Sequence, residues 1–126
     1  MTIVKKKTKI KWFSKPQKRD YPAAQSYLSL HFKPRAAMEI VDRLKHAKTT
    51  EFAAKDIFRA SGLSLLGVSN SHMEKDRAQI IIHESLSPLL LCRDKDHGRL
   101  IIADGYHRLC AVYTFDEDAM IPCRIV

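Results

Sequence analysis

Residues 101–110, with the sequence IIADGYHRLC, hold the side chains of this chain that are best suited to chemistry. A short apolar run ends at the Asp-Gly pair 104–105, and a helical pattern begins at Tyr106. A strand that turns directly into a helix leaves backbone N–H groups unpaired at the helix start, and these donors and the helix dipole favour an anion. Because His107 and Arg108 lie in that first turn, the pattern predicts a phosphate or nucleotide site.

Each side chain of this turn has a chemical and a structural interpretation. Gly105 allows a ligand close to the backbone, and it equally suits a sharp strand-to-helix turn. Arg108 offers a planar fork for phosphate, or it pairs with Asp104 or with the acidic residues 116–118. His107 is a phosphate donor or an acid–base group, or it caps local backbone. Asp104 is a general base, a magnesium ligand or a helix cap.

The other candidate groups carry weaker signals. His72, His83 and His97 lack paired spacing, so we expect them on the surface. The three cysteines form no C-x-x-C pair and no zinc-type spacing, which predicts buried free thiols and no metal site. The sequence contains no Walker A motif, no G-x-S-x-G and no H-E-x-x-H.

Positive charge is concentrated at the start of the chain. The length of 126 residues predicts one domain, with a net charge of +8. Eight basic residues between Lys5 and Arg19 precede the first acid, Asp20, and the rest of the chain holds 14 basic and 14 acidic residues. Residues 1–19 are therefore predicted to be a basic arm that binds DNA or another acidic partner, or that only aids solubility. No apolar run is long enough to span a membrane and no secretory signal is evident, so we expect a cytoplasmic protein.

Apolar periodicity predicts helices in the first two-thirds of the chain. The clearest covers residues 34–47, where Ala37, Ile40, Val41 and Leu44 recur with helical spacing. We expect two more helices, at 22–30 with Asp20 as a cap and at 71–83. The remaining segments are an exposed or edge strand at 3–13, a linker at 14–19, and an ambiguous stretch at 51–60, which is a helix capped by Thr50 or a strand.

The last 40 residues predict a compact α+β unit. A strand at 89–92, a hairpin loop at 94–98 and a strand at 100–103 lead into a helix at 106–115. A final strand follows Pro122, over residues 123–126.

Three segments in this region, 87–91, 100–111 and 121–126, resemble the ParB/sulfiredoxin superfamily, and the whole chain is similar to a bacterial group of small ParB-like proteins. The resemblance covers about residues 55–126. It implies an α+β domain over residues 20–126, with a small mixed sheet and an N-terminal helical extension. It also implies a pocket for a nucleoside triphosphate with Mg²⁺, whose phosphates lie on the basic motif.

Carried onto this sequence, the resemblance implies that Gly105, Tyr106, His107 and Arg108 bind the nucleotide. Asp104, His107 and Glu84 are the candidate catalytic groups, Glu84 because the turn that follows it adjoins the motif in the resembled fold.

The opposite side of the implied pocket would be lined by the segment that contains Arg59, Ser61 and Asn70. Tyr106 stands where sulfiredoxin has its catalytic cysteine, so reduction of sulfinic acids is not predicted. ParB has an acidic residue followed by Arg-Arg at these positions, so its CTP switch is not predicted either.

Three functions follow from these patterns. The first is a nucleotide- or phosphate-binding domain, with NTP hydrolysis or phosphotransfer as a further step. The second is a nucleic-acid-binding accessory protein that uses the basic arm. The third is a catalytically silent interaction module. The sequence leaves open whether the protein is an enzyme and whether it forms oligomers.

Overall fold

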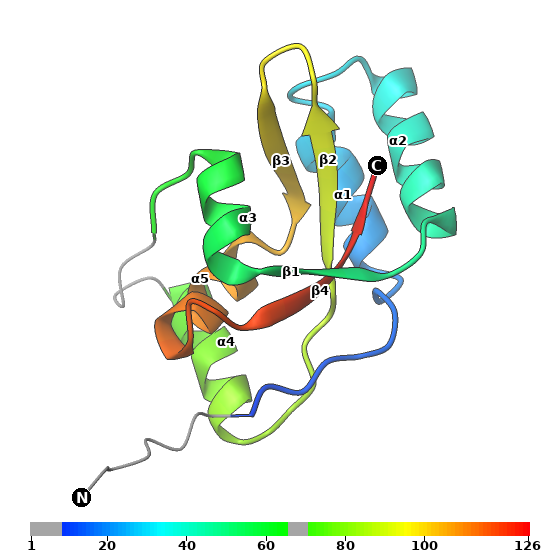
Figure 1. The fold of residues 1–126 in the computed structure, drawn as a ribbon. Helices are drawn as coiled ribbons and strands as arrows, with labels where there is room; N and C mark the ends of the chain where they lie inside the picture. The colour runs from blue at the N-terminus through cyan, green and yellow to red at the C-terminus, as the bar shows by residue number, and fades with distance from the viewer. Residues whose placement is uncertain (1–8, 66–70) are drawn as a thin grey trace, which may run out of the picture.

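The computed structural model describes residues 9–65 and 71–126, which form a mixed four-stranded sheet and five helices. The strand order is β1-β4-β2-β3 (Figure 1). β2 is antiparallel to β3, β4 is antiparallel to β1, and the central pair, β2 and β4, is parallel. The α+β class and the small mixed sheet predicted from the sequence are confirmed. The strands are β1 (Thr50–Ala53), β2 (Leu89–Asp94), β3 (Arg99–Asp104) and β4 (Met120–Ile125).

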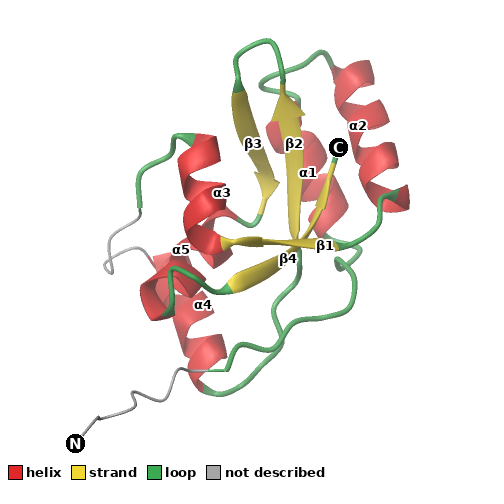
Figure 2. Ribbon diagram, viewed as in Figure 1, coloured by secondary structure: helices red, strands yellow, loops and turns green. Residues whose placement is uncertain are grey.

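The helices cover both faces of the sheet (Figure 2). One pair packs on one face, and the other three helices pack on the opposite face. The first group is α1 (Asp20–Leu28) and α2 (Pro34–His46); the second is α3 (Ala54–Ser61), α4 (Ser71–Ile81) and α5 (Tyr106–Phe115). None of these described helices is long and apolar enough to cross a membrane.

The strand β2 is apolar on both of its faces because each face meets a separate core. Successive side chains of a strand point to opposite faces. Leu89 and Leu91 pack with the α3–α5 side, whereas Leu90 and Cys92 pack with α1 and α2. This double burial explains the uninterrupted apolar run in the sequence.

The helix predicted at 34–47 is confirmed as α2. Its four periodic apolar residues, Ala37, Ile40, Val41 and Leu44, are all buried. Pro34 occupies the first turn, where its missing N–H has no partner to lose.

The ambiguous segment 51–60 contains both a strand and a helix. Thr50 does not cap a helix, because it pairs with Cys123 in the sheet. The helix α3 begins at Ala54, and backbone carbonyls of the loop after α5 accept its first N–H groups. The N–H of Ala54 donates to the carbonyl of Ala119 at 2.9 Å, and that of Lys55 donates to Glu117 at 2.9 Å. These partners are distant in sequence, which is why local patterns did not locate the helix start.

Two predicted boundaries are wrong. The first helix begins at Asp20 rather than Pro22, and its N-cap residue is Arg19, so Asp20 is not the cap. The Asp20 carboxylate is buried and accepts the backbone N–H of Gln17 at 2.8 Å. The last strand begins at Met120 rather than after Pro122. The parallel pairing with β2 starts only at Cys123, so the missing N–H of Pro122 interrupts no bond to β2.

The described part of the N-terminal segment runs along the connection between α4 and β2 (Figure 1). Trp12 forms a parallel bridge with Leu86, in which the Phe13 N–H donates to the Leu86 carbonyl at 2.8 Å. Of the strand predicted at 3–13, residues 9–13 form this single bridge and no ladder, and residues 3–8 lie outside the described residues. Trp12 nevertheless packs against the core, so this part of the arm contacts the folded domain.

Candidate phosphate-binding site

The junction between β3 and α5 is shaped by Gly105. It is the N-cap residue of α5, and its φ of 106° favours glycine. A Cβ atom here would lie 2.8 Å from Cγ of Leu89 and 2.8 Å from Nη2 of Arg108. Packing within the chain therefore requires a glycine at this position, whether or not a ligand approaches the backbone.

Arg108 is held by Asp104, one of the two structural partners expected for it. Its Nη2 atom lies 3.0 Å from Oδ2 of Asp104, and the two side chains are only 17% and 16% exposed. Nη2 also donates to the Pro88 carbonyl at 3.4 Å. The Nε atom of Arg108 is buried and has no hydrogen-bond partner among the described residues. The guanidinium is thus placed by the fold while one of its donors stays unused.

Asp104 is not a helix cap, because Gly105 occupies that position. Burial raises the pKa of Asp104, the Arg108 charge opposes the rise, and the nearby Asp20 carboxyl adds to it. Burial and the neighbouring Asp20 carboxyl therefore make a proton on Asp104 less costly than usual, although Arg108 favours the ionised form.

A cavity of about 410 Å³ opens at the N-terminus of α5. Three separate segments supply its cationic groups: Arg19 precedes α1, Lys75 lies on α4 and Arg108 lies on α5. One carboxylate, that of Asp76, faces the same cavity. The full lining is Arg19, His72, Lys75, Asp76, Gln79, Gly105, His107 and Arg108. Cationic side chains therefore outnumber carboxylates around the helix start, where the macrodipole also favours an anion.

Two imidazoles meet in this cavity. The ring centroids of His72 and His107 are 5.0 Å apart. Burial lowers the pKa of His107 and the charge of His72 lowers it further, whereas Asp76 opposes the fall. The lowered pKa favours the neutral imidazole, in which one ring nitrogen can accept a proton and the other donates a hydrogen bond.

A second cavity, of about 290 Å³, adjoins the first. The two share Arg19, Asp76, Gln79 and Arg108. The second also contains Glu84, whose Oε2 accepts a hydrogen bond from Nε2 of Gln79 at 3.3 Å. Its remaining lining is Phe13, Gln17, Ser85, Leu86 and Ser87. The candidate catalytic residue Glu84 therefore lines the same cavity as Arg108, the last residue of the predicted Asp104–Arg108 motif.

The other predicted site residues lie outside the two cavities. The Tyr106 hydroxyl donates to the Ser64 carbonyl, and its ring packs against the core. Arg59 pairs with Asp56 at 2.8 Å, and the Ser61 hydroxyl donates to the Phe58 carbonyl at 2.9 Å. Asp104 lines neither cavity.

Asn70 lies outside the described residues. Among the described residues no group of three or more His, Cys, Asp or Glu side chains could hold a metal ion. The expected buried free thiols are confirmed for Cys92, Cys110 and Cys123.

The sequence interpretation missed the residues that α4 contributes. His72, Lys75, Asp76 and Gln79 line the cavity, and their spacing of i, i+3, i+4 and i+7 places them on one helix face. That polar stripe is visible in the sequence, but its partner surface is not. His72 is exposed as expected, yet it faces His107 rather than standing alone.

Comparisons with protein-family models, curated proteins and solved structures give no match for this chain. The geometry of the two cavities is therefore the basis for any functional assignment.

Proposed function

We propose that this protein binds a nucleotide, with the phosphates in the cavity at the N-terminus of α5. The observation that carries the proposal is the convergence of Arg19, Lys75 and Arg108 from three separate segments on that helix start. Charge-assisted hydrogen bonds from guanidinium and ammonium groups to phosphate are about twice as strong as neutral ones. The N–H groups of the first turn of α5 add further donors.

The adjoining cavity suits the sugar and base. Phe13 is 42% exposed there and offers an aromatic face for stacking. Glu84, Ser85 and Gln17 supply acceptors and hydroxyl donors for ribose and base edges. A cationic end next to a half-apolar, half-polar end matches the two chemical parts of a nucleotide.

Magnesium would arrive with a triphosphate, since this ion is usually held by one or two carboxylates together with substrate phosphates. We assign that role to Asp76, because it lines the main cavity among the cations. Asp104 is not, because Arg108 already occupies its carboxylate.

Hydrolysis or phosphotransfer would need a base beside the phosphates. We assign this role to His107, which lines the main cavity and whose lowered pKa favours the neutral ring, with Glu84 as the alternative in the adjoining cavity.

Isothermal titration calorimetry with ATP, CTP and their nucleosides tests the proposal. Lys75 is exposed, so Lys75→Gln removes one phosphate partner without disturbing the core, and the expected loss is about tenfold. Lys48→Gln, which removes the same charge outside both cavities, is the matched control. If neither nucleotide binds at millimolar concentration, or if Lys75→Gln binds as the wild type does, the proposal fails.

A further inference from the structure

A third cavity, of about 430 Å³, lies on the α3 face of the sheet between α3 and the β2–β3 hairpin. It shares no lining residue with the two cavities at the β3–α5 junction. Small-molecule sites in proteins typically measure about 300–1,000 Å³, so this cavity is of ligand size.

The interior of this cavity is apolar. Leu91, Leu100 and Ile125 come from three adjacent strands and form its floor, while Ile57 and Phe52 form a wall. Phe52 is 38% exposed, although aromatic side chains are usually covered. An apolar ligand body placed here would cover surface that the protein leaves in contact with water.

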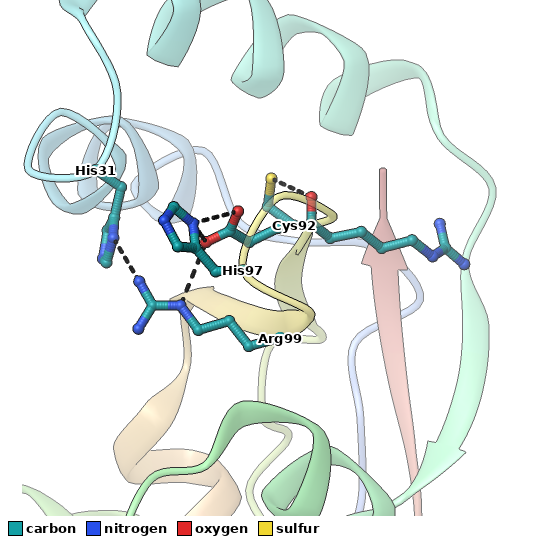
Figure 3. Close-up of polar contacts among 6 residues, drawn as sticks. His31, Cys92, His97 and Arg99 are labelled. Atoms are coloured by element: carbon teal, nitrogen blue, oxygen red, sulfur yellow. Dashed lines mark hydrogen bonds and ion pairs between the residues drawn. The ribbon is translucent and has the colours of Figure 1, made fainter.

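The two acidic side chains at the rim are already neutralised within the chain. Asp94 accepts from Nδ1 of His97 at 2.9 Å and from Nε of Arg99 at 3.3 Å, and Arg99 also reaches His31 at 3.4 Å (Figure 3). The hydrogen bond from His97 lowers the pKa of Asp94, so its carboxylate stays ionised and paired.

The second rim acid, Asp56, is paired with Arg59 at 2.8 Å. Arg93 and Lys95, by contrast, have no ion pair among the described residues. Both line the cavity and both are exposed. The charge left uncompensated at the rim is therefore positive.

We propose that this cavity binds a small carboxylic acid with an apolar body, such as a medium-chain fatty acid. The apolar body lies on Leu91, Leu100 and Ile125, and the carboxylate pairs with Arg93 or Lys95. The planar guanidinium matches a carboxylate with two parallel hydrogen bonds, which a hydroxyl or an ammonium head group cannot reproduce.

NMR titration of the full chain with octanoate, kept below its micelle-forming concentration, tests this site. We expect saturable shifts that centre on Phe52, Leu91 and Leu100. Octanol, which has the same apolar body and no charge, should bind about tenfold or more weakly, the scale of one charge-assisted hydrogen bond.

Two variants and one control separate the contribution of the charge from that of the cavity. Arg93→Gln should weaken octanoate about tenfold, whereas Arg35→Gln, which removes the same charge from α2 on the other face of the sheet, should change nothing. Ala60→Trp fills the cavity from an exposed position on α3 and should abolish binding.

Several results would overturn the inference: shifts that do not saturate, equal affinity for octanol, unchanged binding by Arg93→Gln, or shifts elsewhere on the surface. Preference for an acidic amphipathic peptide over octanoate would also overturn it. Because Lys75 lies outside this cavity, failure here leaves the nucleotide proposal untouched.

Discussion

Replacing Gly105 with alanine should destabilise the fold far more than the same change at Gly98, although both glycines have positive φ. At Gly98, a new Cβ meets nothing within 4 Å, so the cost is backbone strain of about 1–2 kcal/mol. At Gly105, the strain is joined by a 2.8 Å contact with Cγ of the fully buried Leu89. Overpacking a core typically costs about 1–3 kcal/mol more, which gives a total of about 2–5 kcal/mol.

Urea unfolding followed by circular dichroism measures both free energies of unfolding under the same conditions. The second close contact, with Nη2 of Arg108, should also move that guanidinium away from Asp104. We therefore expect Gly105→Ala to weaken nucleotide binding while Gly98→Ala leaves it unchanged. Equal destabilisation by the two substitutions would refute the reasoning, because it would mean that Leu89 moves away from the new methyl group without a loss of folding free energy.

Four further outcomes are expected. Arg108→Ala should cost about 1.5–3 kcal/mol of nucleotide binding by calorimetry and Arg108→Lys less, since a point charge replaces only part of the fork; equal affinities would contradict the site. The pKa of Asp94 is lowered in the folded chain, so its carboxylate stabilises the fold fully above the unfolded pKa of about 3.9. This stabilisation is lost as the pH falls through the lower folded pKa. The melting temperature of Asp94→Asn should therefore depend less on acid pH than that of the wild type. The His107 ring should titrate below 6.5 by NMR, and His72→Ala should move its midpoint upward; an unmoved midpoint would exclude the coupling. Neutralising the lysines at 5–7 with glutamine should reduce any affinity for duplex DNA and its dependence on salt, measured by fluorescence anisotropy; a wild-type chain that ignores DNA at low salt would exclude the basic-arm hypothesis.

The sequence predicted those parts of the fold whose evidence is local. The helix α2 has its apolar residues at regular helical spacing, and the β2–β3 hairpin has two short apolar runs around a polar loop. The turn from β3 into α5 was recognisable from Gly105 and the charged residues beside it. In each case a window of about ten residues contains the physical reason for the structure.

The parts that were missed depend on distant partners. β1 is four residues long and exists because Thr50–Ala53 pairs with β4, so its own residues barely distinguish it from a helix. Arg19 and Lys75 reach the cavity at the N-terminus of α5 only through the packing of α4 on α5 and the position of the segment before α1. The ion pair between Asp104 and Arg108 was one of several alternatives, because spacing alone does not rank a nearby acid above a ligand.

The strand order also constrains the order in which the chain can fold during synthesis. β4 follows every other element in the sequence, yet it lies between β1 and β2 in the sheet. Among the described strands β1 pairs only with β4, so it lacks this partner until residues 120–123 have been made. The sheet therefore cannot be completed before this strand has been made, and until then the edge of β2 that pairs with β4 also lacks its partner. A chain truncated before Met120 should therefore lack both the pairing of β1 and the parallel pairing of β2.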